Sequence, residues 1–303
     1  MQDRGSLPLT IFTPAYNRCT ELKRLYSSLC AQADKRFEWL IVDDGSTDDT
    51  CELATECAQK APFVVRYIRQ ENGGKHVAHN RGATEAAGRY FMCVDSDDWL
   101  EPNAVETILR DSIALDEEEG LLYPKLFSKE TALGTWFPDS VDKIELAEMR
   151  MKYGLVVETA IVFNTEVLRR HPFPVVRGEH FMPEGSSYYS FVMPELFFVR
   201  NEPFYRCEYL DEGLTRNIWK NWLNNPVGTR MALVKRYEAA GRYAGVRALR
   251  ERVAAAVGIE SINIALGKSL TTDLPCSLIW AALLSPVGYC VSKKRFKDSY
   301  RDE

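Results

Sequence analysis

The chain has 303 residues, a formal net charge of −5, 46% hydrophobic residues and 27% charged residues. These values exclude an intrinsically disordered chain, because disorder combines low hydrophobicity with high net charge. The length allows one large domain, or one domain with an appendage, around a substantial core. The start of the chain lacks the basic residues and apolar run of a secretory signal, so we expect a cytoplasmic protein.

Eight cysteines are spread along the chain, and no two of them form a Cys-x-x-Cys pair. No histidine stands where it would complete a zinc ligand set beside them. We therefore expect reduced and mostly buried thiols.

The first third of the chain alternates short apolar runs with segments of helical periodicity. Buried strands are predicted at residues 7–12, 37–42, 63–68 and 89–94, and the first of them is expected to stop at Thr13-Pro14. Helices are predicted over residues 19–32, then up to Lys60 with Ser46 or Thr47 as the cap, and from the Asn72-Gly73-Gly74 turn to Ala87. This alternation predicts an α/β sheet.

The rest of the chain allows a coarser prediction. A helix is expected over residues 102–115, and strands over residues 120–127 and 160–163 without a readable pairing. From Asn225 onward, residues 231–240 and 243–266 are alanine-rich and periodic. They predict a helical C-terminal region.

Polar residues follow three of the predicted strands, at the point where each strand ends. These groups are residues 13–17, Asp43 with Asp44, and residues 95–98. Ligands of α/β sheets bind at the carboxyl ends of the strands, so we expect the three groups to meet at one edge.

The acidic group after the fourth strand suits a metal ion. Asp95, Asp97 and Asp98 emerge together from an apolar strand and would repel one another without a cation. Mg²⁺ and Mn²⁺ prefer oxygen ligands and complete their shell with water and substrate phosphates. An isolated Asp-Ser-Asp-Asp is more often a turn that caps the following helix, so this interpretation depends on the other strand ends.

The other two strand ends suit a nucleotide. Asp43 and Asp44 alone would be interpreted as a turn, but beside a second acidic strand end they can accept hydrogen bonds from a ribose or a base. Tyr16 offers a ring against which a base can stack. No Gly-x-Gly-x-x-Gly follows the first strand, which argues against a dinucleotide-binding Rossmann site.

Four motifs, in this order and spacing, resemble glycosyltransferase family 2. They are FTPAYNR at residues 12–18, VDDGSTD at 42–48, Asn72-Gly73-Gly74 followed by HNRG at 79–82, and VDSDD at 94–98. The resemblance covers residues 7–115. It implies a GT-A fold, a nucleotide-diphospho-sugar donor, a divalent metal (Mn²⁺ or Mg²⁺) and inversion at the anomeric carbon.

The resemblance also implies site residues. Thr13, Pro14, Tyr16 and Asp44 would line the nucleoside pocket with support from Asp43, and Asn17 and Ser96 belong to the same nucleotide-sugar site. Asp95 and Asp97 would serve the ribose, the diphosphate and the metal. The family commonly has Ala-Arg-Asn-x-Gly where this chain has His79 in the arginine position. A positive residue near the sugar or phosphate would therefore come from Lys75 or Arg81.

An inverting transfer requires a base that takes the proton from the acceptor hydroxyl, usually a carboxylate. GEHFMPEG at residues 178–185 resembles the segment that supplies it in a subset of bacterial members. Glu184 is the first candidate and Glu179 the second, and an ordinary loop glutamate is the alternative. His180 is more often structural than an acceptor-site residue. Residues 201–203 and 209–215 also resemble that subset, and we hypothesise that this stretch closes over the acceptor.

The C-terminal region is basic. From Leu214 onward 15 Lys and Arg stand against 7 Asp and Glu, a formal +8, whereas the residues before it carry −13. Residues 275–291 are apolar but too short to span a bilayer, and Pro286 and Gly288 interrupt them. Attachment to an anionic membrane surface and packing on the catalytic domain are both open interpretations. No nucleic-acid-binding motif accompanies the charge.

We therefore predict an α/β protein with a GT-A catalytic domain at residues 1–226 and a helical, basic region at 227–303. Residues 7–115 would form the nucleotide-sugar half and residues 116–226 the acceptor half. The predicted function is transfer of a sugar, with a UDP-sugar as the favoured donor, to a glycan or lipid-linked saccharide of a bacterial surface polysaccharide. The alternatives are a catalytically degenerate member and a sugar-nucleotide pyrophosphorylase, against which the sequence after the first strand argues.

Overall fold

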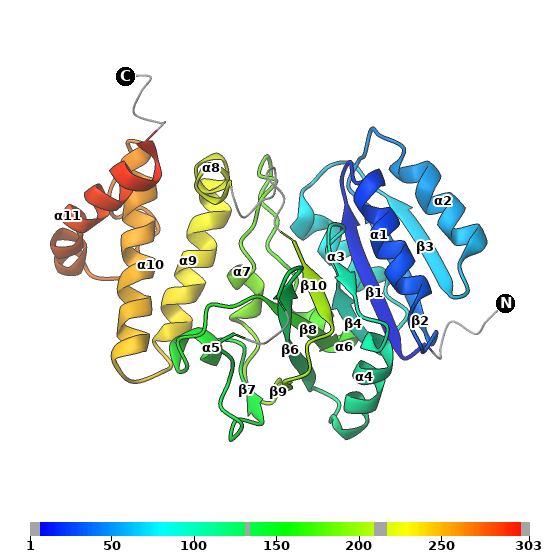
Figure 1. Cartoon of the computed structure of the whole chain (residues 1–303). Helices are drawn as coiled ribbons and strands as arrows, with labels where there is room; N and C mark the ends of the chain where they lie inside the picture. Colours follow the sequence, from blue (N-terminus) through cyan, green and yellow to red (C-terminus); the bar gives the residue numbers. More distant parts are fainter. Residues whose placement is uncertain (1–6, 131–133, 209–216, 298–303) are drawn as a thin grey trace. The chain divides into compact units, whose positions relative to one another are not determined.

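The computed structural model describes residues 7–130, 134–208 and 217–297 (Figure 1). The chain forms two compact units. Unit 1 comprises Met1–Glu145, Leu155–Pro172 and Val192–Leu210, and unit 2 comprises Leu146–Gly154, Phe173–Phe191 and Asp211–Glu303. Unit 2 thus takes up two segments that precede residue 226, and the predicted domain boundary there stays a prediction.

The first half of unit 1 is a parallel sheet. Its strands are β1 (Leu9–Ala15), β2 (Phe37–Asp43), β3 (Val64–Arg69) and β4 (Tyr90–Cys93), in the order β3-β2-β1-β4. The connecting helices are α1 (Cys19–Cys30), α2 (Thr50–Lys60) and α3 (Lys75–Glu85). Parallel strands joined by helices confirm the predicted α/β class.

The second half of unit 1 makes the sheet mixed. It adds β5 (Trp99–Leu100), β6 (Gly120–Phe127), β7 (Lys143–Ile144), β8 (Thr159–Asn164), β9 (Phe197–Val199) and β10 (Tyr205–Cys207). Strand β8 runs antiparallel to both β4 and β6, which continues the sheet beyond the parallel half. Strand β6 then pairs with β9 through its first residues and with β10 through its last ones. The helical segments here are α4 (Ala104–Asp111), η1 (Ser112–Ala114) and α6 (Thr165–Arg170).

The core of unit 1 explains one glycine of the family-like motifs. A Cβ on Gly82 would lie 2.4 Å from the ring of Phe12, so only glycine lets α3 approach β1 this closely. The Phe12 ring also stacks on Phe91 of β4, with ring centroids 5.2 Å apart. Phe12 therefore fixes α3 above two neighbouring strands.

Strand β1 runs past the predicted stop at Pro14 and ends at Ala15, so the expected end was wrong. Pro14 and Ala15 still pair with β2, whereas the pairing with β4 ends at Phe12. Successive backbone groups of a central strand point to alternate neighbours, and the Ala15 carbonyl faces β2. Pro14 is thus turned toward the side where β4 has already ended, so no hydrogen bond is lost.

The predicted cap of α2 was also wrong. The helix begins at Thr50 after Asp49, and neither Ser46 nor Thr47 caps it. The Asp48 carboxylate accepts a hydrogen bond from the Thr50 backbone N–H at 3.2 Å. Ser46 and Thr47 instead form hydrogen bonds with Asn17, just after the end of β1.

The eight cysteines are free thiols, as expected, but most of them are not buried. Cys57 and Cys207 are buried, Cys290 is exposed and the other five are partly exposed.

Unit 2 is helical among its described residues. It contains α5 (Glu148–Met151), α7 (Gly185–Tyr188), α8 (Ile218–Asn224), α9 (Pro226–Ala240), α10 (Val246–Ala265) and α11 (Leu278–Arg295). Helices α9, α10 and α11 lie side by side (Figure 1). The predicted helical C-terminal region is confirmed. Within the part of the chain that the structure describes, no helix is both long enough and apolar enough to cross a bilayer.

Helices α10 and α11 enclose a carboxyl group. Glu260 is fully buried, and neither of its carboxyl oxygens has a hydrogen-bond partner among the described residues. A Cβ on Gly288 of α11 would lie 2.8 Å from Glu260 Oε2, so the glycine leaves room for the carboxyl group. Burial raises the pKa of Glu260 from 4.5 to about 7.

We predict that Glu260 makes the stability of the protein depend on pH. The folded state holds the Glu260 proton more tightly than the unfolded state, so unfolding becomes easier as the pH rises from about 4.5 and the loss levels off above about 7. The pKa difference corresponds to about 3 kcal/mol. Glu260→Gln should therefore gain stability relative to the unchanged protein at pH 8 but not at pH 4.5, as measured by thermal denaturation.

The exposed Glu238 of α9 offers the matched control. Glu238→Gln should follow the unchanged protein across the whole pH range. If the Glu260→Gln difference is the same at both pH values, Glu260 is ionised in the folded state and the prediction fails.

Candidate active site

The carboxyl ends of β1, β2 and β4 meet at one edge, because these neighbouring strands are parallel. At the end of β1, Tyr16 is 50% exposed and Pro14 is partly buried. Thr13 is fully buried, and its hydroxyl accepts a hydrogen bond from Trp39 Nε1 at 3.0 Å. The Tyr16 ring is thus available for stacking, whereas the Thr13 side chain packs within the sheet.

Asn17 connects the end of β1 to the loop after β2. It has a positive φ of 53°, a left-handed conformation that asparagine tolerates better than most residues. Its backbone N–H donates to Ser46 Oγ at 2.8 Å, and its side-chain oxygen accepts from the Thr47 N–H at 2.8 Å. Asn17 therefore holds two strand ends together and leaves Tyr16 at the surface.

Asp43 and Asp44 are both buried and both accept hydrogen bonds from the protein. Asp43 accepts from the Ser46 N–H at 2.7 Å and from the Tyr67 hydroxyl. Asp44 accepts from the backbone N–H groups of Gly73 at 2.9 Å and Gly74 at 2.7 Å. Asp44 thus shapes the glycine turn. Its Oδ1 also accepts from Gln70 Nε2 at 2.7 Å, so Oδ2 is the oxygen with a lone pair left for a further donor.

The glycine turn leads directly into Lys75, the first residue of α3. Lys75 Nζ lies 2.7 Å from Asp95 Oδ1, at the end of β4. Arg81 lies further along α3 and pairs with Glu85 at 2.8 Å. Of the two predicted cations, Lys75 is therefore the one that the structure brings to the acidic group.

A second lysine influences Asp95. Burial alone would raise the pKa of Asp95, but the charges of Lys75 and Lys125 outweigh it and lower this pKa to about 2. Lys125 belongs to β6, where it interrupts an apolar strand. Asp95 is therefore ionised at neutral pH.

The pKa of Asp97 is shifted in the opposite direction from that of Asp95. It is partly exposed, and both its burial and the neighbouring negative charge of Asp95 raise its pKa above the ordinary value. Ser96, between them, is buried. A cation bound at Asp97 would relieve this repulsion.

The residues present fit a divalent ion of the kind predicted. Among residues 7–130, 134–208 and 217–297, no three His, Cys, Asp or Glu side chains are grouped so as to hold a metal ion by themselves. Asp95 and Asp97 offer hard carboxylate oxygens, which suit Mg²⁺ or Mn²⁺. Such ions are commonly held by one or two carboxylates together with water and substrate phosphates.

Tyr205 of β10 fixes the acidic loop, and the sequence analysis missed it. Its hydroxyl donates to Asp98 Oδ2 at 2.7 Å and accepts from the Asp95 backbone N–H at 3.0 Å. Lys125 Nζ lies 3.9 Å from the Tyr205 ring centroid and 3.7 Å from Asp98 Oδ2. Burial outweighs the charge of Lys125 and raises the pKa of Asp98 to about 7.

Arg24 of α1 was missed as well. It pairs with Glu208 at 2.7 Å, lies 4.2 Å from the Trp99 ring centroid and donates to the Asp97 carbonyl. Of Tyr205, Lys125 and Arg24, only Lys125 could have been noticed in the sequence, because it interrupts an apolar strand. Tyr205 and Arg24 reach the acidic loop from segments that are far away along the chain.

His79, which replaces the usual arginine of the family, has a packing role. It is buried, and its ring lies edge-on to Phe12 and Phe91, with centroids 5.6 and 5.3 Å away. Burial, and secondarily the charge of Lys75, lowers its pKa to about 3, so the ring is neutral.

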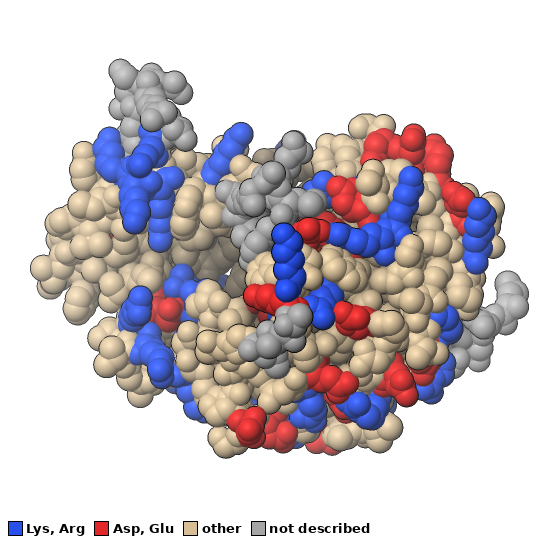
Figure 2. All heavy atoms as spheres, viewed as in Figure 1, with Lys and Arg blue, Asp and Glu red and all other residues tan. Residues whose placement is uncertain are grey.

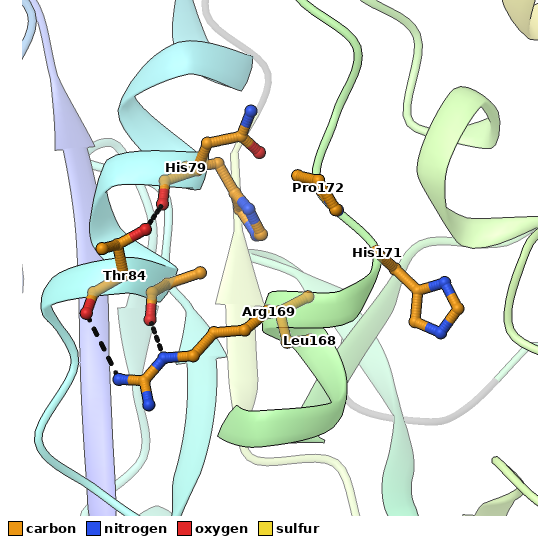
Figure 3. A pocket seen from close by; sticks show the side chains of 8 residues that line it. His79, Thr84, Leu168, Arg169, His171 and Pro172 are labelled. Carbon is orange, nitrogen blue, oxygen red and sulfur yellow. Dashed lines mark hydrogen bonds between the residues drawn. The ribbon is translucent and has the colours of Figure 1, made fainter.

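His79 also lines a small cavity beside α3 and α6 (Figure 3). The cavity measures about 60 Å³, enough for water but not for a sugar. Beside it, Arg169 of α6 donates to the carbonyls of Ala83 at 2.9 Å and Thr84 at 3.3 Å, at the C-terminal end of α3 (Figure 3). This cavity therefore belongs to the contact between two helices.

The two candidate bases lie in unit 2 and differ in their surroundings. Glu179 accepts hydrogen bonds from the backbone N–H groups of Val227 at 2.8 Å and Gly228 at 2.7 Å, at the start of α9. Its carboxylate thus satisfies the first turn of that helix. Glu184 is exposed and immediately precedes α7. The backbone N–H of His180 donates to Asn225 Oδ1 at 2.7 Å.

The segments expected to close over the acceptor are only partly described. Asn201 Nδ2 donates to Asp139 Oδ1 at 3.2 Å, and Glu202 pairs with Arg110 at 2.7 Å, both within unit 1. Residues 209–215 lie outside the described residues.

Comparison with known proteins finds a family match in the first half of the chain. The model of glycosyl transferase family 2 matches residues 10–150. The glycosyltransferase GlyA of Streptococcus pneumoniae is 33% identical over 127 residues, which are 38% of this chain and 18% of GlyA. The chain covers 18% of GlyA and 31% of the uncharacterized glycosyltransferase YibD of Escherichia coli, less than a third of either relative.

Solved structures share the fold over almost the whole chain. Staphylococcus aureus TarS 1–349, in complex with UDP-GlcNAc, has a TM-score of 0.59 and 16% identity, covering 97% of this chain and 93% of TarS 1–349. The mannosyltransferase PcManGT of Pyrobaculum calidifontis, in complex with GDP-Man and Mn²⁺, has a TM-score of 0.54 and 17% identity, covering 98% and 84%. Residues 10–150 therefore match the family 2 glycosyltransferase model, and the chain shares the GT-A fold of these structures.

Proposed function

We propose that the protein transfers a sugar from a nucleotide-diphospho-sugar to a glycan or lipid-linked saccharide, with inversion at the anomeric carbon. The observation that carries this proposal is the shared edge of three parallel strands, which Tyr16, Asp44 and Asp95 follow and where Lys75 pairs with Asp95. Both structures compared above contain nucleotide-sugars, one with UDP and one with GDP. We favour a UDP-sugar.

In this proposal, each strand end has its own task. The Tyr16 ring stacks on the base, Asp44 accepts from the base or ribose, and Asp43 and Asn17 hold the loop around them. Lys75 and Ser96 lie beside the diphosphate, where the lysine charge offsets that of the phosphates. All the residues with these tasks belong to unit 1.

Asp95 and Asp97 would hold Mn²⁺ or Mg²⁺, an interpretation that the Mn²⁺ in the PcManGT structure supports. When bound, the ion would supply positive charge for the departing diphosphate. Asp95 is ionised without it, and Asp97 is the carboxylate whose ionisation it would favour.

Glu184 is the proposed base. It would take the proton from the acceptor hydroxyl as the oxygen attacks the anomeric carbon and the bond to the diphosphate breaks. Glu179 already accepts two backbone hydrogen bonds, so its carboxylate is less available for this task. A degenerate member would bind the donor without this step, and turnover distinguishes the two. No feature of the described residues favours a pyrophosphorylase.

Asp97→Ala should remove the metal-dependent part of donor binding. Losing a residue that only supports a metal ligand typically costs roughly 10–100-fold in affinity, and losing a proposed ligand should cost at least as much. Titration calorimetry with UDP-GlcNAc and with GDP-mannose, in Mn²⁺ and in EDTA, measures the effect. Asp142→Ala, at an exposed carboxylate of unit 1, is the control. Equal affinities for Asp97→Ala and the unchanged protein in Mn²⁺ would rule out this ligand.

Tyr205→Phe should weaken donor binding by up to about 30-fold, because Asp98 and the Asp95 N–H each lose a hydrogen bond worth about 1 kcal/mol. The matched control is Tyr123→Phe, which removes a hydroxyl bonded to Asp111 at 2.8 Å elsewhere in unit 1. Both variants should lose some thermal stability, but only Tyr205→Phe should lose affinity. An equal loss of affinity in both would indicate a general effect on the fold.

Glu184→Gln should keep donor binding and lose turnover by roughly 10²–10⁴-fold, the usual contribution of a general base. Glu179→Gln should keep turnover and lower the melting temperature, because it weakens the cap of α9. Release of the nucleotide from the donor in the presence of an acceptor panel measures turnover. Normal turnover in Glu184→Gln would mean that the base lies elsewhere. Nucleotide-sugar binding without turnover in the unchanged protein would favour a degenerate member.

A further inference from the structure

Helix α11 carries its large apolar side chains on its outward face. Ile279, Leu283 and Val287 follow one another at four-residue spacing and are 74%, 64% and 50% exposed. Trp280 and Tyr289 are exposed beside them. A helix on the surface of a globular protein normally turns such a stripe toward the core. In α11 the apolar stripe faces away from the core instead.

The inward face of α11 consists of small residues instead. Ala281, Gly288 and Ser292 are its buried positions. The Ser292 hydroxyl donates to the Ser261 carbonyl of α10 at 2.8 Å, and Gly288 lies against Glu260. These contacts define which side of α11 faces α10. The apolar stripe therefore has no covering element among the described residues of unit 2.

The C-terminal end of the stripe is cationic. Lys293, Lys294 and Lys297 are exposed, and Arg295 lies 4.3 Å from the Trp219 ring centroid. Figure 2 shows Lys and Arg side chains gathered over one part of α11 and its surroundings, beside a surface over α11 that is almost free of charge. An apolar stripe thus continues directly into a basic patch.

We propose that α11 docks on an anionic lipid bilayer. Its aliphatic side chains would enter the boundary between headgroups and acyl chains, where Trp280 and Tyr289 also suit the mixed polarity. Lys293 and Lys294 would meet anionic headgroups, each contributing roughly fivefold to the affinity. A second copy of this chain would instead bring the same positive charge, so charge complementarity favours the lipid. This inference is independent of the proposed sugar transfer.

The orientation follows from the length and composition of the helix. Residues Leu278–Arg295 form 18 residues of helix, shorter than the roughly 20 apolar residues that a spanning helix requires. The three basic residues of its last turn shorten the apolar part further. The helix would therefore lie in the plane of the interface, with its small-residue face kept against α10.

Flotation of the full chain with vesicles tests the proposal. The protein should float with vesicles of phosphatidylcholine and phosphatidylglycerol, and much less with phosphatidylcholine alone. The double variant I279S and L283S should bind at least about tenfold more weakly, because two exposed apolar side chains no longer enter the lipid. The double variant K293Q and K294Q should lose roughly 25-fold, and high salt should have a similar effect.

Matched controls come from the same unit. V246S with L249S changes two exposed apolar residues of α10, and K152Q with K235Q changes two exposed lysines, so both should bind like the unchanged protein. Circular dichroism confirms that each variant is folded. Absence of flotation, or equal losses in controls and test variants, would overturn the proposal. So would a dimer in size-exclusion chromatography without lipid that I279S with L283S dissociates, because a second copy would then cover the stripe.

Discussion

The carboxylate of Asp44 accepts hydrogen bonds from the backbone amides of Gly73 and Gly74, and the arrangement of the site depends on this contact. The turn that it shapes starts α3, whose first residue, Lys75, reaches Asp95 at the end of β4. One carboxylate at the end of β2 therefore determines which cation stands beside a carboxylate two strands away. Asn17 adds the end of β1 through Ser46 and Thr47. Hydrogen bonds and one ion pair thus connect the three strand ends.

The parallel half of the fold could be predicted from the sequence because its strands are mostly apolar runs of four to seven residues that alternate with helical segments. Strands β5, β7, β9 and β10 are two or three residues long and leave no period to detect. The end of β1 was predicted wrongly because of Pro14. A proline stops a central strand only where its missing N–H would have donated to a neighbouring strand. That depends on where β4 ends, which is a property of the sheet and not of the local sequence.

The residues around the acidic loop show the same limit for the site. The order of the aspartates along the chain predicts their position, and the structure brings them to the expected edge. Tyr205 stands 110 residues after Asp95 and reaches it only because β10 pairs with both β6 and β5. Glu179 and Glu184 are two glutamates of one short segment, so the sequence alone does not distinguish their roles. They differ in their surroundings: the first amides of α9 bind Glu179, whereas Glu184 is exposed just before α7.

Helix α11 contains a proline and a glycine, two residue types that weaken helices, and it continues through both. Pro286 lies within the helix and is exposed, and Gly288 is buried against Glu260. A larger residue than Gly288 would push α11 away from α10, because the carboxyl group already fills the space. Close approach therefore requires small residues on the inward face, and the large apolar residues of the same helix are left on the outward one. Gly288, which argued against a spanning helix, thus also belongs to the small-residue face that packs on α10.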